Sequence, residues 1–346
     1  MTQTHLPATD TAPEFGVPVP IVPGIRWLRL PLPFRLDHVN VWLLDDEGPD
    51  GEGATTVVDT GIFDAPTRAV WDQLLPVLAA EGRPVRRIIV THCHPDHVGM
   101  AGWLAEQTGA PLLMSASEYL TSLAIHLDPS ALEAEPYRSF YASHGLDPAA
   151  TQRMLQNGHA YLRMVSPLPR VFRRIIAGEQ LVIGGRHWDV LTGGGHAPEQ
   201  VMLHCPAEAL MLCADQILLR ISPNISVQAT DPDGDPLGIY LRSLSQLRAT
   251  IPDDTFLLPG HNLPFRGVHA RIDALAAHHA ERLAAIVAAC SAVPISAADL
   301  VPVVFGRVVD DPHQMGFAFS EALAHANLLV RRGALRQVEG GFVRQP

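Results

Sequence analysis

Apolar side chains follow two different spacings in the N-terminal third of the chain. Between residues 25 and 58, short runs of alternating apolar and polar residues are separated by turn-forming residues, a pattern that predicts β-strands. Residues 65–80 repeat apolar side chains at helical spacing. The β-branched run 85–90 predicts another strand, and residues 98–107 predict a helix whose first turn begins near Pro95. Alternating strands and helices predict a layered α/β fold.

The pattern changes between residues 115 and 175, where the strand signals disappear. Residues 117–127, 130–144 and 148–165 predict three helices, and this stretch contains most of the tyrosines of the chain. We interpret it as a helical insertion. Two roles remain open for it: a lid that shapes a substrate pocket, or a surface for dimerisation.

The two ends of the chain differ from its middle. Residues 1–22 are rich in proline and small polar residues without periodicity, which predicts an extended arm, with a disordered tail as the alternative. Residues 23–290 form the main domain. Residues 291–346 predict two helices, at 296–305 and 320–332, followed by a hairpin.

The composition of the chain argues against some classes of binding partner and favours others. With 346 residues, 47% of them hydrophobic, the chain can bury a large core, and it has no apolar run long enough to cross a membrane. A formal charge of −11 argues against broad contact with nucleic acid and favours a small-molecule substrate. The four cysteines lack C-x-x-C spacing and the N-terminus does not resemble a signal peptide, so we expect reduced thiols and a cytoplasmic protein.

Four potential metal ligands lie within six residues after the predicted strand 85–90. His92 and His94, two residues apart on an extended loop, can point the same way and share one metal, while Asp96 and His97 can serve a second. Cys93 lies between two ligands, but on an extended loop its side chain should point away from theirs. We therefore predict a two-metal hydrolase site without a thiolate ligand.

The segment His92-Cys93-His94-Pro95-Asp96-His97 resembles the H-x-H-x-D-H signature of the metallo-β-lactamase-fold hydrolases. That family also has an aspartate at an early strand end, a later Gly-His pair, a second strand-end aspartate and a final histidine. The chain has these in order: Asp59, Gly195-His196, Asp215 and Gly260-His261. The resemblance covers residues 20–290 and implies an α/β fold, the four-layer αββα sandwich.

The resemblance also implies a glyoxalase II-like set of ligands around two metal ions. One ion would be held by His92, His94 and His196, the other by Asp96, His97 and His261, with Asp215 bridging them and Asp59 supporting the ligand loop. These ligand types favour two zinc ions, with iron or manganese as alternatives. Two metal ions can share a water whose pKa falls to about 7, which gives a hydroxide nucleophile. Asp96 and Asp215 would be catalytic by orienting it.

The loop after Asp215 follows a metal ligand directly and should line the cleft. Loops beyond strand ends carry function disproportionately, so Arg220, Ser222 and Asn224 are candidates for contact with substrate. The alternative is that these side chains only fix the loop.

The C-terminal segment resembles the small winged-helix-like domain of a subgroup of this family that includes endoribonuclease-like members. Its predicted wing is short and not strongly basic, since Arg331, Arg332, Arg336 and Arg344 are offset by Glu339. We expect it to pack against the main domain or a partner subunit, and a homodimer is left open.

These observations favour hydrolysis of a small ester-, thioester- or lactone-like substrate by a hydroxide that bridges two metals. An RNA-cleaving nuclease is one alternative, and a hydrolytic dehalogenase or iron-dependent sulfur dioxygenase is another. A non-enzymatic, metal-stabilised binding module is the third, although structural metal sites usually have fewer and mostly thiolate or histidine ligands.

Overall fold

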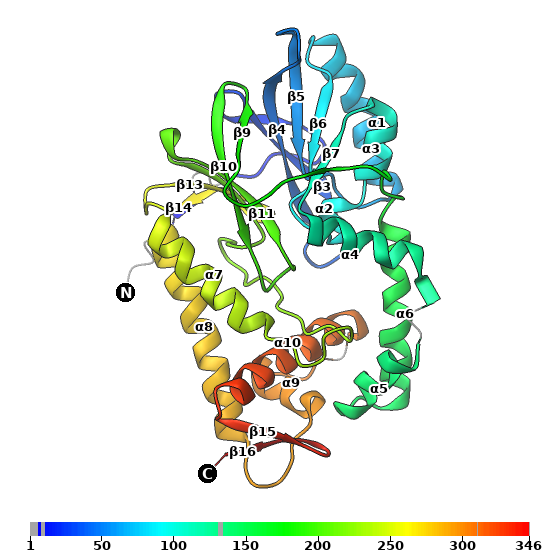
Figure 1. Cartoon of the computed structure of the whole chain (residues 1–346), viewed down its shortest axis with the longest axis vertical. Helices are drawn as coiled ribbons and strands as arrows, with labels where there is room; N and C mark the ends of the chain where they lie inside the picture. The colour runs from blue at the N-terminus through cyan, green and yellow to red at the C-terminus, as the bar shows by residue number, and fades with distance from the viewer. Residues whose placement is uncertain (1–5, 8–10, 131–133, 310, 346) are drawn as a thin grey trace.

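Two seven-stranded mixed sheets pack face to face (Figure 1). The computed structural model describes residues 6–7, 11–130, 134–309 and 311–345. In spatial order, the first sheet is β2 (Val19–Val22), β3 (Ile25–Pro31), β4 (His38–Glu47), β5 (Gly53–Val58), β6 (Val85–Ile89), β7 (Leu112–Met114) and β8 (Arg173–Arg174). The second is β1 (Leu6–Pro7), β14 (Phe265–Arg266), β13 (Phe256–Pro259), β12 (Leu210–Ala214), β11 (Gln200–Cys205), β10 (Arg186–Gly193) and β9 (Gln180–Ile183). Their inner faces bury Trp27, Trp42 and Trp188 in one apolar cluster.

Helices cover the outer face of each sheet. The first sheet is covered by α1 (Ala65–Ala80) and α3 (Ala101–Thr108), and the second by α7 (Pro236–Thr250) and α8 (Val268–Ala289). In α1 the buried side chains Trp71, Leu74 and Leu78 recur at helical spacing, and Asp64 caps the first turn by accepting a hydrogen bond from the Thr67 N–H at 2.8 Å. These layers confirm the predicted αββα sandwich.

The helix predicted at 98–107 is interrupted. The structure has a short α2 (Pro95–Val98) before α3, because Gly99 and Met100 bond to neighbouring segments: the Gly99 carbonyl accepts from the Ser166 N–H, and the Met100 N–H donates to the Gly61 carbonyl. A Cβ at position 99 would lie only 2.4 Å from the Pro95 carbonyl oxygen, so this close approach requires glycine.

The described part of the predicted N-terminal arm contributes an edge strand to each sheet. β1 pairs antiparallel with β14, and β2 pairs antiparallel with β3. Residues 1–5 and 8–10 of the arm lie outside the described residues.

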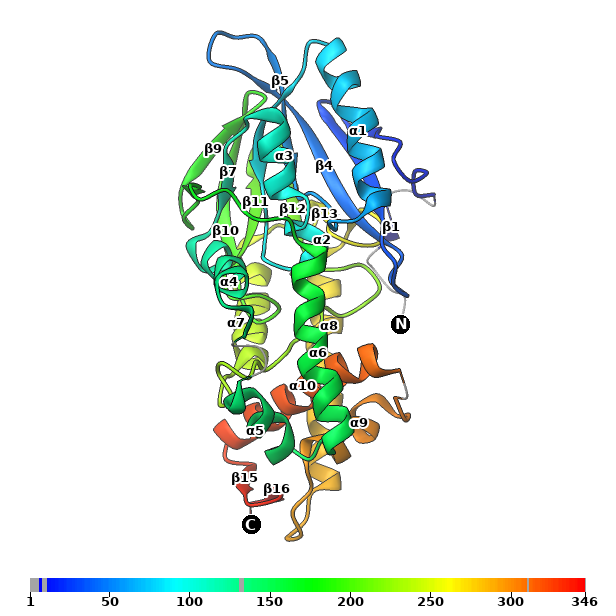
Figure 2. The ribbon, with the colours of Figure 1, turned by 90° about the vertical axis from the view of Figure 1, so that its right-hand side faces the viewer.

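The helical insertion contains α4 (Ala116–Leu127), α5 (Glu135–Ser143) and α6 (Pro148–Met164), and α6 runs from the sandwich to the C-terminal helices (Figures 1 and 2). The Phe140 ring meets Phe319 edge-on at a centroid distance of 6.4 Å, and the Ala298 N–H donates to the His144 carbonyl. The far end of the insertion therefore packs against the C-terminal domain.

That small C-terminal domain consists of α9 (Ala297–Phe305), α10 (Pro312–Arg331) and the hairpin of β15 (Leu335–Val338) and β16 (Gly341–Arg344), and it shares an apolar core with α7 and α8. The second helix begins eight residues earlier than the predicted Ser320, because Asp311 caps it by accepting from the Gln314 N–H. None of the helices in the described ranges combines the length and apolar character that a membrane span requires.

Candidate metal centre

Five of the seven predicted ligands lie on loops that follow the C-terminal ends of strands in the two sheets, and the other two, Asp96 and His97, lie in the short helix α2. The segment 91–97 follows β6 and the loop 194–199 follows β10. Asp215 directly follows β12, and His261 lies two residues after the end of β13. Because these strand ends meet at one edge of the sandwich, the folded chain brings together residues that are up to 169 positions apart (92 to 261). The converging residues are His92, His94, Asp96, His97, His196, Asp215 and His261.

Three histidines form the first ligand group. The Nε2 atom of His92 lies 3.1 Å from Nδ1 of His94, which in turn lies 3.0 Å from Nε2 of His196. Burial lowers the pKa of His92 well below its usual range and that of His94 to about 3. Both imidazoles are therefore neutral at physiological pH, the form that binds a metal.

The second group combines histidines with carboxylates. His261 Nε2 lies 3.2 Å from Oδ2 of both Asp96 and Asp215, and His97 Nε2 lies 3.5 Å from Asp215 Oδ1. Asp215 Oδ2 also lies 3.5 Å from His196 Nε2 in the first group. Asp215 therefore lies between the two groups, where a bridging ligand would be.

Two buried atoms in this space lack a hydrogen-bond partner among the described residues: His97 Nε2 and Asp215 Oδ1. Burial disfavours the charged forms of both side chains, but Asp215 and Asp96 raise the pKa of His97, and His261 and His97 lower the pKa of Asp215. Buried polar atoms without partners are costly, and a cation would satisfy both. The residues present therefore fit a metal centre.

Hydrogen bonds from surrounding groups orient the ligand rings. Asp59, whose φ of 61° places it in the left-handed region, accepts from the Thr91 N–H at 2.8 Å and lies 2.8 Å from His97 Nδ1. His196 Nδ1 lies 2.8 Å from the Asn224 carbonyl oxygen. These bonds leave Nε2 of both rings directed at the centre, as in many metal sites.

A family model described as the metallo-beta-lactamase superfamily matches residues 34–261, about two thirds of the chain, and this range includes all seven predicted ligands. This chain belongs to the metallo-beta-lactamase superfamily. A second family model, described as the metallo-beta-lactamase-like C-terminal domain, matches residues 283–344. The chain is thus a hydrolase of this superfamily with a candidate metal site of histidines and aspartates.

Relatives of the chain agree with this assignment. It is similar to a crystal structure of a beta-lactamase domain protein from Burkholderia ambifaria, with 41% identity, a TM-score of 0.86 and coverage of 97% of this chain and 96% of that one. A metallo-beta-lactamase family protein from Thermus thermophilus is 29% identical with a TM-score of 0.77, over 94% and 100% of the two chains. A curated hydroxyacylglutathione hydrolase from Pseudomonas entomophila is 28% identical over 63% of this chain and 76% of its own length.

Cys93 lies between the first two histidines of the superfamily signature, and its environment agrees with the prediction that it is not a metal ligand. Cys93 is buried, and burial followed by the neighbouring Glu118 charge raises the pKa of its thiol. A neutral thiol is a poor metal ligand, and Cys93 is absent from the ligand groups among the described residues.

The three predicted substrate contacts lie on the loop after Asp215. Arg220 is exposed, and its N–H donates to Asn262 Oδ1 at 3.3 Å. Ser222 is half-buried. The Asn224 side chain donates to Glu321 Oε2 at 3.0 Å, and this bond anchors the loop to α10. Contact of these side chains with substrate stays a prediction.

Sequence reasoning missed residues of the helical insertion that touch the ligand loops. Glu118 on α4 is fully buried and bonds to the backbone of Cys93, and Tyr161 on α6 bonds to the same residue. Their positions follow from how the insertion folds back onto the sandwich, which no spacing in the sequence signals.

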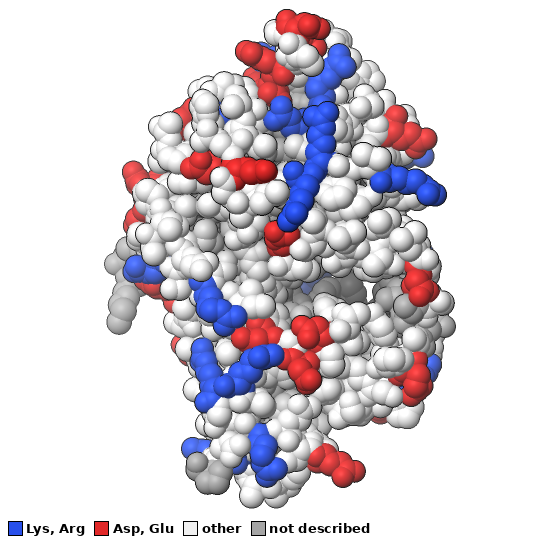
Figure 3. Space-filling view, in the orientation of Figure 1, with Lys and Arg blue, Asp and Glu red and all other residues white. Residues whose placement is uncertain are grey.

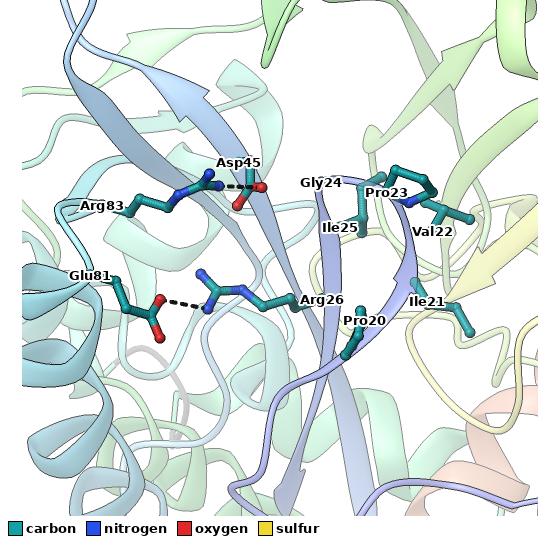
Figure 4. A pocket seen from close by; sticks show the side chains of 10 residues that line it. All are labelled: Pro20, Ile21, Val22, Pro23, Gly24, Ile25, Arg26, Asp45, Glu81 and Arg83. Carbon is teal, nitrogen blue, oxygen red and sulfur yellow. Dashed lines mark hydrogen bonds and ion pairs between the residues drawn. The ribbon is translucent and has the colours of Figure 1, made fainter.

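A pocket of about 560 Å³ lies elsewhere on the first sheet (Figure 4). Its arginines, Arg26 and Arg83, are paired with Glu81 and Asp45, so the pocket offers no free charge of either sign from these groups. Asp45 lies seven residues along β4 from His38, whose carbonyl accepts from a ligand histidine, a separation of about 23 Å at roughly 3.3 Å per residue. This pocket is distant from the metal centre.

Proposed function

We propose that the chain hydrolyses a small ester-, thioester- or lactone-like substrate with the help of two zinc ions. The observation that carries this proposal is the position of Asp215 between two complete ligand groups, with one buried oxygen facing the unpartnered Nε2 of His97 in the described part of the chain. When bound, metal ions at these groups supply a hydroxide nucleophile at neutral pH by lowering the pKa of water to about 7. No serine or cysteine nucleophile is then required.

Two carboxylates have separate roles in this proposal. Asp215 is almost fully buried and holds its position between the two groups of histidines, whereas 20% of the Asp96 side chain is exposed. The Asp96 carboxylate is thus the one nearer to solvent, where it orients the attacking water and can accept its proton. His97 and His261 hold the two carboxylates in place from the buried side.

The curated relative favours a thioester within this substrate class. Its name specifies a hydroxyacylglutathione, in which the acyl group is carried by a thiol. The four cysteines in the chain are free and buried, which fits the reduced, cytoplasmic setting that we propose.

Surface charge weighs against the alternative of RNA cleavage. Acidic and basic side chains are interspersed on the face shown in Figure 3, and the formal charge of the chain is −11. Arg331, next to the hairpin, donates to the Asp233 carbonyl. A broad basic surface, the usual electrostatic footprint of a nucleic-acid-binding protein, is therefore missing from the described residues on this face.

Replacement of a ligand from each group tests the proposal. His94→Ala and Asp215→Ala should abolish turnover of a panel of thioester, lactone and β-lactam substrates, because each removes a metal ligand. His187→Ala is a matched control, since this histidine is exposed and its ring bonds to the Gln180 side chain, away from the ligand loops. Full activity in either ligand variant after its metal sites are emptied would contradict metal-dependent hydrolysis.

A further inference from the structure

Both backbone polar groups of Cys93, the residue between the ligands His92 and His94, are held by the helical insertion. The Cys93 N–H donates to Glu118 Oε2 at 2.9 Å, and its carbonyl accepts from the Tyr161 hydroxyl at 2.7 Å. The first partner is on α4 and the second on α6. Two helices of the insertion thus fix the short segment that separates two ligands of the same group.

Glu118 also bonds to the second ligand loop. Its Oε1 atom accepts from the Glu199 N–H at 2.6 Å, three residues after the ligand His196. The Glu199 side chain in turn accepts from the Ser117 hydroxyl at 2.8 Å. The first turn of α4 therefore both accepts a hydrogen bond from this loop and donates one to it. A single carboxylate therefore joins the two loops that supply the three histidines of the first group.

Burial of the Glu118 carboxylate away from a paired cation has a free-energy cost. Glu118 is fully buried, and its two oxygens accept from two backbone N–H groups, with no arginine paired to it in the described part of the chain. A glutamate that only had to stabilise a helix would be placed at lower cost on the surface. Buried, hydrogen-bonded groups around metal ligands are instead a common means of setting ligand geometry.

We propose that Glu118 is a positioning residue that sets the distance between the loops 91–97 and 194–199, and hence the geometry of the three-histidine group. Tyr161 fixes the other end of the same segment. In this proposal the insertion builds part of the metal centre, a role distinct from both the lid and the dimerisation surface. The proposal rests on the metal centre of the proposed function, and it is independent of the substrate.

Glu118→Gln tests the hydrogen bonds of the carboxylate alone, because it keeps the size of the side chain. An amide has one carbonyl oxygen, so it can accept from only one of the two N–H groups and must turn its own NH₂ toward the other. Glu106→Gln is the matched control, since Glu106 is an exposed glutamate on the neighbouring helix α3. Tyr161→Phe removes only the hydroxyl and tests the second contact.

The readout is metal binding by the purified full-length protein without substrate. Zinc is titrated into metal-free protein in competition with a chromophoric chelator, and thermal unfolding of the metal-free protein is measured in parallel. In Glu118→Gln we expect the affinity for one zinc equivalent to fall roughly 10–100-fold while the other stays within about twofold. Tyr161→Phe should weaken the same equivalent to a smaller extent, and Glu106→Gln should match the wild type.

Unchanged affinity for both equivalents in Glu118→Gln and Tyr161→Phe would overturn the proposal, even if the unfolding temperature of the metal-free protein fell. That pattern would show a purely structural role. Selective loss of one equivalent supports the proposal whether or not any thioester or lactone is hydrolysed. The positioning role and the proposed function therefore fail on different results.

Discussion

A buried ion pair links the C-terminal domain to the candidate metal ligand His196. The guanidinium group of Arg282 on α8 pairs with Glu321 on α10, and the other carboxylate oxygen of Glu321 accepts from the side chain of Asn224 at 3.0 Å. The Asn224 carbonyl in turn holds the ring of His196. Only 15% of the Arg282 side chain and 6% of the Glu321 side chain are exposed, and burial raises the pKa of Glu321 to about 7.

The variant Arg282→Met should destabilise the folded protein by about 3–5 kcal/mol at pH 8, the usual cost of leaving one partner of a buried ion pair uncompensated. Loss of the contact between the guanidinium and the Phe305 ring, at 4.7 Å, adds about 1 kcal/mol. The pKa of Glu321 in the folded protein lies above its ordinary 4.5, so the folded state binds this proton more tightly than the unfolded state does. The contribution of Glu321 to stability is therefore greatest below pH 4.5 and declines as the pH rises through about 7.

Removal of the guanidinium cation raises this pKa further, so the loss should be larger at about pH 8 than at about pH 5. Urea denaturation of metal-free protein at both pH values gives the free energies of unfolding. The double variant Arg282→Met/Glu321→Gln should recover most of the loss at the higher pH, because no buried charge remains. A loss under about 1 kcal/mol at the higher pH, or equal losses at the two pH values, would show that Arg282 does not compensate a buried charge on Glu321.

Further predictions concern the candidate metal ligands. Burial opposes protonation of His261, but Asp215 and Asp96 raise its pKa to about 10, so metal binding should release protons and tighten from about pH 6 to 9. Calorimetry in buffers of different ionisation enthalpy measures this release, and zero release would contradict it. Asp59→Asn should weaken metal binding roughly 10–100-fold in equilibrium dialysis, because it disturbs the partner of His97, and undiminished binding would exclude that role. Chelation should lower the melting temperature of the wild type, since zinc at about 1,000 times its Kd contributes about 4 kcal/mol to stability, and an unchanged melting temperature would argue against a bound metal.

The convergence of the candidate ligands is predictable because each of them lies near the end of a recognisable strand. The β-branched run before His92 and the strand patterns before His196, Asp215 and His261 place these residues at strand ends, and strand ends of packed sheets meet at one edge. The helix at 65–80 is equally predictable from the sequence, since its buried residues recur at helical spacing.

Other features depend on tertiary contacts that the sequence does not display. The break at Gly99 exists because the backbone of residue 61 and the carbonyl of residue 164 approach it, and Glu118 meets Cys93 only after the insertion has folded. His279 on α8 is buried against His325 on α10 at an Nδ1–Nε2 distance of 3.1 Å, a contact that depends on the packing of these two helices. The early start of α10 does have a local signal in the sequence, the pair Asp311-Pro312.

Metal content and hydrolysis, measured on one sample, decide whether the protein is a two-zinc hydrolase. The protein is purified without added metal, its metals are quantified by elemental analysis, and the same preparation is assayed against thioester, lactone and β-lactam substrates. We predict two zinc ions per chain and turnover of one substrate class. One iron per chain with oxygen-dependent activity, or hydrolysis that persists after complete metal removal, would contradict the account.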